Sequence, residues 1–510
     1  MCPIGEDCDI AVPTDLIGPG GREGAPTRYG GALWAVALSF FVTITVLGSM
    51  GSCVMYEHWP LTGLLVVGGI LAAATIVGRQ TIMRPSAPWW LAAVLALALA
   101  LRVGCVLLIP YAPTADFQVY HDAGVHMADD WTLGVQAADG IQGGYRCFYA
   151  PGQVFSLGVM YALFGKHVLA GQMLNVLYGT LTVLGIWYLA RRLFGEPNAR
   201  IASLLVAVHP SMIFGCMLLG AEVPEAFWLV LALCLYVAAT RGRFRRVWGP
   251  LLCGVALGIG ALIRATYVLL PIPIALHMIL SSPRRGRAFL SAGIMVLGVA
   301  AAVLPWTYRN YRVTGGFILI SSNGGGNLYS ANNDDAVGNY TESAWVLLYE
   351  TCPDDLTLHR KGMRLATEWI RTHPRRFAEL AVQKFAILWG ASKDIPWWAL
   401  EHPVMERKRL GVPWRFRFLS MAYATGFYAA CSLFAAVGLW TRRRMLRGDS
   451  AWIVLVAIIL YFTAVHMVFE SQGKYHFMML PLLCIFAALP AEPAEPRPVT
   501  LPIPLGQTER

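Results

Sequence analysis

Apolar runs long enough to cross a lipid bilayer recur along this chain from residue 31 almost to its end. A membrane-spanning helix needs about 20 mostly apolar residues, because each residue advances about 1.5 Å along the axis. Roughly twelve runs approach this length. The clear runs are 31–50, 61–78, 89–109, 168–190, 201–219, 289–306, 418–440 and 451–469. The less clear runs are 223–239, 249–263, 265–280 and 477–489. With 56% hydrophobic and only 14% charged residues, the chain is not a soluble globular domain, and we predict an all-α polytopic membrane protein.

Basic residues in the short loops between these runs predict which side of the membrane each loop faces. Lys and Arg next to a span resist translocation, so short basic loops stay in the cytoplasm. Placing all of them inside puts both termini in the cytoplasm. The net charge of +10 follows largely from this bias and implies no nucleic-acid partner. The basic loops are Arg79 with Arg84, Arg191 and Arg192 with Arg200, 241–246, 284–287 and 442–447, and the outer segments are 111–166, 219–222, 308–417 and 470–476.

One apolar run does not fit this threading as a span. Residues 377–391 are apolar but few, and they include Lys384. Counting them as a span would export the basic loop 442–447, so we interpret them as an interfacial or re-entrant helix.

The outer segments contain the regions in which a small folded unit is expected. Segment 308–417 has a strand-like run at 317–320, a Gly/Asn-rich loop at 322–329 and a helical pattern at 356–370, which predict a small α/β insertion. The tail of the first outer loop, 154–164, has the pattern of an interfacial amphipathic helix. The predicted division is a disordered N-terminus 1–30, three spans in 31–109, an outer loop 110–167, spans in 168–307, an outer segment 308–417, spans in 418–489 and a disordered tail 490–510.

The eleven cysteines are mostly single and lie within spans, without CxxC spacing, so no metal or redox site is predicted. Cys147 and Cys352 are both in outer segments, where a disulfide is compatible with the compartment. The pairing stays open, because geometry decides it.

Asp116 is the first candidate for chemistry. It follows the run 89–109 by a few residues, and a carboxylate at such a boundary suits a general base or a charge stabiliser. The alternative is a solvated loop carboxylate, which position alone favours. Asp122, with His121 beside it, has the same two interpretations.

Glu222 lies at the outer end of a span, and Pro224 begins the next span in a preferred first-turn position. A glutamate there gains from the helix N-terminus, so a capping role is as well supported as a functional one. Glu225 competes for either role.

Arg264 interrupts the apolar stretch 251–280, where a charge costs at least a few kcal/mol. An ionisable residue at that depth predicts function, here binding of a lipid phosphate, and the alternative is snorkelling to the interface. Arg309, Arg312, Lys474 and His476 lie on the same predicted face and could complete a phosphate clamp, although such residues also anchor interfaces.

Several short motifs occur in an order and spacing that resemble one family. They are Asp116 in the first large outer loop, 149–155 followed by 163–165, 191–195, Glu222 before a Pro-containing span, 262–264, 309–311, 315–317, 323–327 and 474–476. With these motifs, residues 101–489 resemble the GT-C membrane glycosyltransferases, and most closely bacterial relatives of the protein O-mannosyltransferases and the lipid A aminoarabinose transferase.

The resemblance implies transfer of a sugar from a polyprenyl-phosphate donor to a hydroxyl of a glycan, lipid or protein, on the non-cytoplasmic face of a bacterial inner membrane. It implies that Asp116 is the catalytic base and that Glu222 assists in the acceptor site. The implied donor-phosphate ligands are Arg264, Arg309, Lys474 and His476, and the implied sugar or acceptor contacts are Tyr120, His121, Asp122, Tyr149, Asn323, Asn327 and Tyr475. No cofactor is predicted. A divalent-cation requirement stays open, because Phe117 stands where the family often has a second acidic residue.

Two other classes of function fit a polytopic membrane protein. A transporter or flippase for an amphipathic or lipid-linked substrate would have paired charges or broken helices near the midplane. The polar features here fall in outer loops instead, and no internal repeat is visible, so the enzyme is favoured. A non-catalytic scaffold of a glycan-polymerising machine would tolerate replacement of Asp116.

Overall fold

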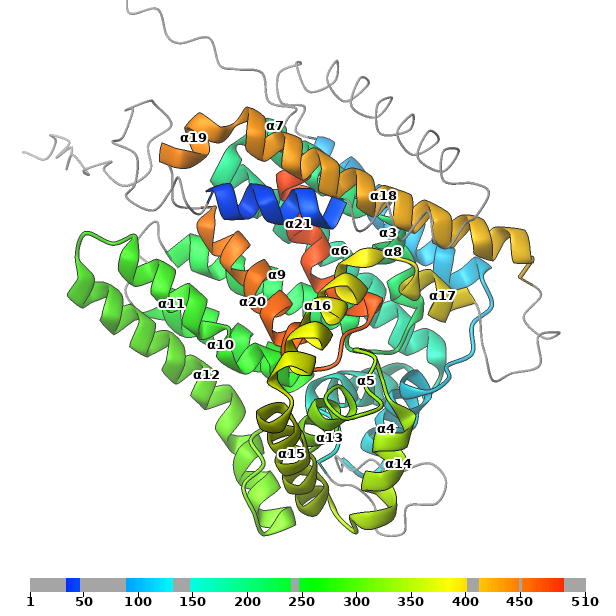
Figure 1. The fold of residues 1–510 in the computed structure, drawn as a ribbon. Helices are drawn as coiled ribbons and strands as arrows, with labels where there is room; N and C mark the ends of the chain where they lie inside the picture. The colour runs from blue at the N-terminus through cyan, green and yellow to red at the C-terminus, as the bar shows by residue number, and fades with distance from the viewer. Residues whose placement is uncertain are drawn as a thin grey trace, which may run out of the picture.

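The computed structural model describes residues 34–45, 89–131, 147–239, 247–400, 412–448 and 452–489. Within these residues the chain forms helices and no β-strand, which confirms the predicted all-α class (Figure 1). After helix Trp34–Thr45 come α3 (Trp90–Leu108), α4 (Asp116–Asp130), α5 (Pro151–Phe164), α6 (Val168–Phe194), α7 (Glu196–Val208), α8 (Pro210–Phe214), η1 (Gly215–Met217), α9 (Glu222–Ala239), α10 (Trp248–Ile263), η3 (Ala265–Leu269), α11 (Pro271–Leu280) and α12 (Arg285–Thr314). Then follow α13 (Asn323–Ser330), α14 (Glu342–Thr351), α15 (Asp355–Thr372), α16 (Pro374–Gly390), α17 (Asp394–Leu400), α18 (Trp414–Thr441), α19 (Arg443–Gly448), α20 (Ile453–Val468), η4 (Gly473–Met479) and α21 (Leu480–Ala487).

Among the described helices, five are long and apolar enough to cross a membrane, namely α3, α6, α9, α12 and α18. The pair Glu196–Val208 and Pro210–Met217 would form a sixth span, bent by 56°. The other predicted runs in the described residues also form helices, but these have only 10–17 residues, so within this part of the chain fewer helices than the roughly twelve expected spans reach the full length of a span. Two of the predicted apolar stretches are interrupted within the helical region. One helix ends before His209-Pro210 and another ends before Arg264, where a proline or a charge interrupts the apolar pattern. The predicted span 61–78 lies outside the described residues.

Helices α10 and α12 pack with their backbones in direct contact. A Cβ atom on Gly254 would collide with the carbonyl oxygen of Met295, and one on Gly298 would collide with that of Leu251. Small residues let membrane helices approach this closely.

The unit formed by α13, α14 and α15, within the predicted outer segment 308–417, differs from the predicted α/β insertion. The predicted Gly/Asn-rich loop is helix α13, because its glycines let it lie directly against α15. A Cβ on Gly325 would meet the backbone of His359, and one on Gly362 would lie 2.9 Å from the nitrogen of Gly326. The glycines therefore serve close helix packing and not a flexible turn. The predicted helical pattern at 356–370 is confirmed as α15.

The strand-like run 317–320 forms no strand, because its carbonyl groups are already bonded to side chains of α12. Asn310 Nδ2 donates to the carbonyls of Ile318 and Ile320, at 3.2 and 3.0 Å. Thr307 and Trp306 donate to the next carbonyls, Leu319 and Ile320. No partner strand is needed to satisfy this backbone.

Helix α16 occupies the predicted interfacial or re-entrant segment, and α5 occupies the predicted amphipathic one. The buried face of α16 includes Lys384 and Leu388 and packs against α20 and η4. Where these helices lie relative to a bilayer stays a prediction, as do the domain boundaries and the side of the membrane. The predicted disordered ends 1–30 and 490–510 lie outside the described residues.

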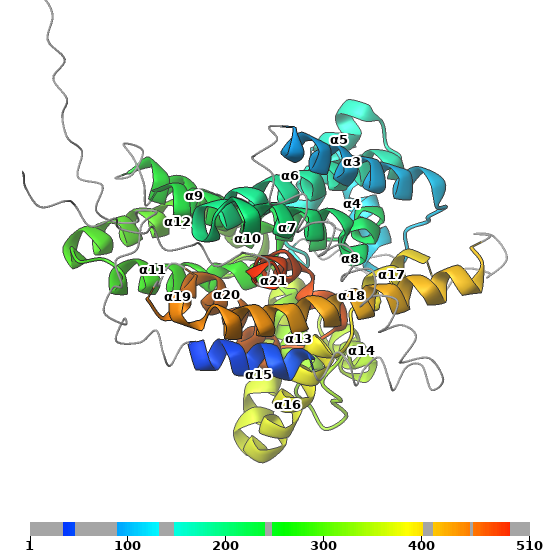
Figure 2. The same cartoon turned by 90° about the horizontal axis from the view of Figure 1, so that it is seen from above.

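The helices form two ends of the molecule. In Figure 1, α7, α18 and α19 lie at one end, and α4, α13, α14 and α15 lie at the other. Seen from above in Figure 2, helix Trp34–Thr45 runs alongside α18, with α15 and α16 projecting beyond it. Helix α9 packs against α10 and against η4, the segment after α20.

Candidate functional site

Arg264 holds two carboxylates at once. It is the C-cap of α10, and Glu222 and Glu225 lie in the first turn of the neighbouring helix α9. Its Nη2 lies 3.2 Å from Oε1 of Glu222, and its Nε lies 2.8 Å from Oε2 of Glu225. All three side chains are largely buried, so each ion pair offsets the cost of removing its partner from water.

Tyr475 connects this ion-pair group to the chain after α20. The guanidinium of Arg264 lies 5.0 Å from the centre of the Tyr475 ring, within the range of a cation–π contact. Two further interactions hold the Tyr475 side chain. Its ring stacks on that of His466, and its hydroxyl donates a hydrogen bond to Oε1 of Glu470 at 2.7 Å.

Asp116 lies in the first turn of α4, where the helix N-terminus favours a negative charge. The preceding Ala115 has φ of +48°, in the left-handed region that a residue with a Cβ seldom adopts. Tyr149 donates to Oδ1 of Asp116 at 2.9 Å, and Nζ of Lys474 lies 3.9 Å from Oδ2. The Asp116 side chain is 55% exposed, so the carboxylate is held from two sides and still open to a substrate.

Lys474 places its ammonium among aromatic rings. Its Nζ lies 5.6 Å from the ring centres of Phe117 and Trp398 and 5.7 Å from that of Tyr475. Its backbone N–H donates to Oδ2 of Asp394. Burial raises the pKa of Asp394, against the lowering effect of Lys393 and Lys474. The rings restrict where the ammonium can point, and the near ion pair with Asp116 fixes one direction.

Two tyrosines lie near Asp116, and Tyr120 also interacts electrostatically with Arg264. Burial raises the pKa of Tyr120, an effect that Arg264 opposes and Asp116 adds to. Burial also raises the pKa of Tyr149 well above its ordinary value, and the carboxylate of Asp116 raises it further. Both hydroxyls therefore keep their protons near neutral pH and can act as donors. The two rings lie 5.2 Å apart.

Asp116, Tyr149, Lys474, Tyr475, Glu470, Arg264, Glu222 and Glu225 thus form one connected group, which we call the carboxylate–cation cluster. Three of the predicted phosphate and base residues, Asp116, Arg264 and Lys474, are in it. The cluster is what a site for a negatively charged ligand headgroup and a neighbouring nucleophile would require.

Two predicted phosphate ligands lie elsewhere. His476 is buried, and its ring nitrogens contact the carbonyl of Leu388 and the hydroxyl of Ser392. Arg309 lies over the ring of Trp306 and contacts Asn310. His476 follows Tyr475 directly, but the 3-10 turn of η4 sends consecutive side chains in different directions, a feature that the residue order does not reveal.

The remaining predicted contacts lie outside the cluster. His121 bonds to the hydroxyl of Tyr161, and burial lowers its pKa. Asp122 accepts from Gln118. Asn323 and Asn327 lie on α13, where the side chain of Asn323 accepts from Ser321. Their proposed contacts to a sugar or acceptor stay predictions.

Glu470 was not among the predicted site residues, although it belongs to the cluster. It lies in the predicted outer segment 470–476, directly after a span, which is the same signal that selected Asp116. Glu225 was named only as a competitor of Glu222, and the structure gives both residues the same partner.

Cys147 and Cys352 are both buried, and the backbone N–H of Cys147 donates to Asp355, which lies in the first turn of the helix after Cys352. Their pairing stays a prediction. In the part of the chain that the structure describes, no group of three or more His, Cys, Asp or Glu side chains is arranged to hold a metal ion. The question of a divalent cation stays open.

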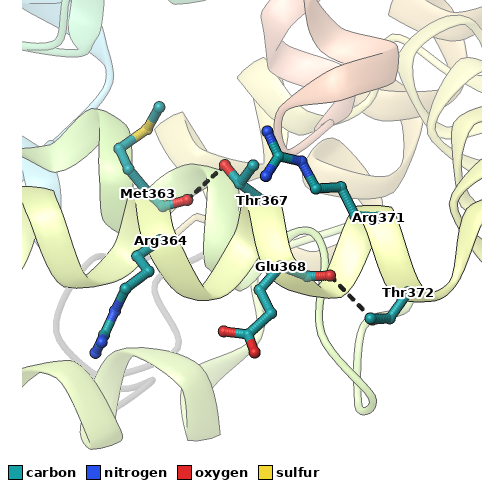
Figure 3. Close-up of a pocket in the computed structure, with 6 residues that line it drawn as sticks. All are labelled: Met363, Arg364, Thr367, Glu368, Arg371 and Thr372. Carbon is teal, nitrogen blue, oxygen red and sulfur yellow. Dashed lines mark hydrogen bonds between the residues drawn. The ribbon is translucent and has the colours of Figure 1, made fainter.

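A separate hollow of about 590 Å³ lies along the outer surface of α15 (Figure 3). Its lining is Met363, Arg364, Thr367, Glu368, Arg371 and Thr372, all from one helix. None of these residues belongs to the carboxylate–cation cluster, so the hollow is a surface depression and the chemistry lies with the cluster.

The fold and the cluster define a polytopic helical membrane protein in which four carboxylates and two cations, Arg264 and Lys474, lie together. Residues 150–308 match the family model of dolichyl-phosphate-mannose-protein mannosyltransferase. This region contains Glu222, Glu225 and Arg264, whereas Asp116 and Lys474 lie outside it. The match therefore covers one part of the cluster.

Two curated relatives from different bacteria have the same description. An undecaprenyl phosphate-alpha-4-amino-4-deoxy-L-arabinose arabinosyl transferase of Pseudomonas aeruginosa (strain UCBPP-PA14) is 32% identical over 169 residues, which are 32% of this chain and 31% of that protein. The protein of the same description from Erwinia tasmaniensis is 28% identical over 148 residues, 28% of this chain and 27% of that protein. The chain thus matches less than a third of the length of either relative. Together with the family match, these relatives confirm the predicted resemblance to the GT-C superfamily.

Two solved structures have a similar course of the chain. The archaeal oligosaccharyltransferase AglB from Archaeoglobus fulgidus, in complex with an inhibitory peptide and a dolichol-phosphate, has 16% identity and a TM-score of 0.48, and the alignment covers 79% of this chain and 50% of that one. ArnT from Cupriavidus metallidurans, bound to undecaprenyl phosphate, has 16% identity and a TM-score of 0.39, with 79% and 78% of the two chains covered.

Proposed function

We propose that this protein is a membrane glycosyltransferase that moves a sugar from a polyprenyl-phosphate donor to an acceptor hydroxyl on the non-cytoplasmic face. The observation that carries the proposal is the carboxylate–cation cluster, in which Asp116 lies 3.9 Å from Lys474 and Arg264 contacts the neighbouring Tyr475. A general base and two cations on adjacent elements are the groups that transfer from a phosphate leaving group needs.

In the proposed reaction the acceptor oxygen attacks the anomeric carbon of the sugar. The bond from that carbon to the phosphate oxygen breaks, and the polyprenyl phosphate leaves with the electron pair. Asp116 takes the proton of the acceptor hydroxyl, a role worth roughly 10² to 10⁴ in rate. Its 55% exposure leaves room for the hydroxyl to reach it.

Arg264 and Lys474 would stabilise the negative charge that develops on the phosphate. Arg264 uses Nε and Nη2 for its two glutamates, so the hydrogens of Nη1 remain for a phosphate oxygen. Glu222, expected to assist in the acceptor site, is better explained as a residue that orients Arg264, because its Oε1 contacts the guanidinium. Lys474 would approach the phosphate from the side of Asp116.

The relatives support the kind of donor. One group is described as acting on undecaprenyl phosphate-linked aminoarabinose, and the family model is named for a dolichyl-phosphate-mannose donor. A polyprenyl-phosphate sugar is common to both. In this proposal the transferred sugar is a pentose or a hexose and the acceptor is a glycan, lipid or protein, and the bacterial source of the curated relatives supports a place in the bacterial inner membrane.

The test is mass spectrometry of envelope glycans and polyprenyl-phosphate sugars after deletion of the gene. We expect one sugar to disappear from the glycans and its lipid-linked form to accumulate. Complementation with Asp116→Asn should leave this pattern unchanged, whereas Asp130→Asn, an exposed carboxylate at the other end of α4, should restore the sugar.

Three results would overturn the proposal in different ways. Unaltered glycans in the deletion strain would remove the transferase function. Full restoration by Asp116→Asn would remove Asp116 from the mechanism and favour a scaffold. Accumulation of the lipid-linked sugar confined to the cytoplasmic leaflet would favour the flippase.

A further inference from the structure

Glu470 is held in place along its backbone. It follows α20, and its carbonyl accepts a hydrogen bond from Nδ1 of His466, while the next N–H, that of Ser471, donates to Gly338. The side chain is 6% exposed. The position of the carboxylate is therefore set by the fold.

The two oxygens of this carboxylate differ in their partners. Oε1 accepts from Nε2 of Gln472 and from the hydroxyl of Tyr475, both at 2.7 Å. Oε2 is buried and has no hydrogen-bond donor among the described residues. A buried acceptor without a donor is destabilising unless another group supplies the hydrogen.

The surroundings of Glu470 belong to the carboxylate–cation cluster. Burial raises the pKa of Glu470, the hydrogen bond from Tyr475 and the charge of Lys474 oppose this rise, and Asp116 adds to it. Lys474 and Asp116 are thus close enough to act on Glu470. Glu222 and Glu225 also each have one buried oxygen without a donor, Oε2 and Oε1 respectively. Unused acceptors therefore recur in the cluster.

The unused acceptor Oε2 of Glu470 indicates which kind of ligand group could bind there. A carboxylate repels the phosphate of a lipid donor, which would be drawn to Arg264 and Lys474 instead. The group that fits Oε2 carries a polar hydrogen, as the hydroxyl and amino groups of a sugar ring do. We propose that Glu470 is a specificity-determining residue of this site, whose Oε2 accepts a hydrogen bond from a hydroxyl or amino group of the transferred sugar. This inference rests on the proposed glycosyltransferase function.

The variant Glu470→Gln tests the role of Oε2 separately from that of Oε1. The amide oxygen can keep the bonds from Gln472 and Tyr475, while an NH₂ group replaces the unused acceptor Oε2. The matched control is Glu342→Gln, which changes an exposed glutamate at the start of α14. At pH 4, where Glu470 is largely protonated in both the folded and the unfolded protein, thermal unfolding in detergent should be similar for both variants and the wild type, because the bonds of Oε1 are retained.

Two ligands distinguish the sugar from the phosphate. One is undecaprenyl phosphate alone, measured by equilibrium binding, and the other is the lipid-linked sugar that accumulates in the deletion strain, measured in a transfer assay. For Glu470→Gln we expect undecaprenyl phosphate binding within about twofold of wild type and a KM for the lipid-linked sugar raised roughly tenfold or more, as for a lost charged hydrogen bond. Glu342→Gln should change neither.

These measurements distinguish a failure of the Glu470 inference from a failure of the proposed glycosyltransferase function. If the wild type transfers sugar and Glu470→Gln has an unchanged KM, Glu470 does not contact the sugar and the inference fails alone. If undecaprenyl phosphate binding falls equally, Glu470 acts through the cations and the inference is also overturned. If the wild type transfers nothing and deletion alters no glycan, the proposed function fails and this inference fails with it.

Discussion

The ammonium of Lys474 lies 3.9 Å from Oδ2 of Asp116, although the two residues come from opposite ends of the folded chain. Tyr475, next to Lys474, lies under Arg264. The two residues Lys474 and Tyr475 after α20 thus connect the predicted base Asp116 to the predicted phosphate ligand Arg264.

Lys474→Met should weaken the binding of undecaprenyl phosphate roughly tenfold or more, because one charge-assisted hydrogen bond to the phosphate is lost. Lys474→Arg should retain much of the affinity, because it keeps the charge. Isothermal titration in detergent measures both. Lys166→Met, which removes an exposed lysine paired with Asp129, is the control, and an equal loss there would point to a non-specific charge effect.

Arg264→Lys should reduce undecaprenyl phosphate binding although the charge is kept, because an ammonium lacks the planar fork that contacts both glutamates and a phosphate. Arg264→Met should in addition destabilise the fold by about 3–5 kcal/mol, since it leaves Glu222 and Glu225 buried without a counter-charge. Thermal unfolding separates the two effects. Wild-type affinity in Arg264→Lys would show that the fork is not used.

Gly254→Val should destabilise the α10–α12 contact by several kcal/mol, because its side chain would collide with the backbone of Met295. Gly293→Ala on α12 is the matched control. A Cβ there meets no atom within 4 Å, so alanine should be neutral or mildly stabilising. The readout is the unfolding temperature in detergent, and similar values for both variants would contradict the close packing.

The stability that Glu470 contributes should fall as pH rises. Burial raises its pKa in the folded protein, so the folded state keeps a proton that the unfolded state releases above its ordinary pKa of about 4.3. The contribution is complete below that pH and is lost as pH rises through the folded-state pKa. The difference in unfolding temperature between wild type and Glu470→Gln, measured from pH 4 to pH 8, should therefore shift against the wild type at high pH. A difference independent of pH would contradict the raised pKa.

The apolar pattern predicted the long apolar helices of the described residues, but not α4, α14 or α17, because helix periodicity and length are local properties. It failed where tertiary contacts satisfied the backbone in another way. The run 317–320 was predicted as a strand, but Asn310 and Thr307 already bond its carbonyls. The glycines of α13 were predicted as a loop, but they serve contact with α15.

The candidate site was predicted in part for the same reason. Asp116 and Arg264 could be selected because a charge beside or within an apolar run is unfavourable unless it has a partner, and this is visible in one dimension. Lys474 and His476 gave the same signal. Only the 3-10 turn of η4 placed Lys474 in the cluster and His476 against Leu388 of α16 and Ser392.

By itself, the sequence determined that this protein is helical, that it belongs in a membrane and which charged residues need an explanation, because hydrophobic burial and charge desolvation depend on residue type and spacing. Only the tertiary structure decided that Tyr475 bridges Arg264 and Glu470 and that Glu470 keeps one oxygen without a donor. Such contacts join elements distant along the chain, and they depend on how side chains pack rather than on any local pattern.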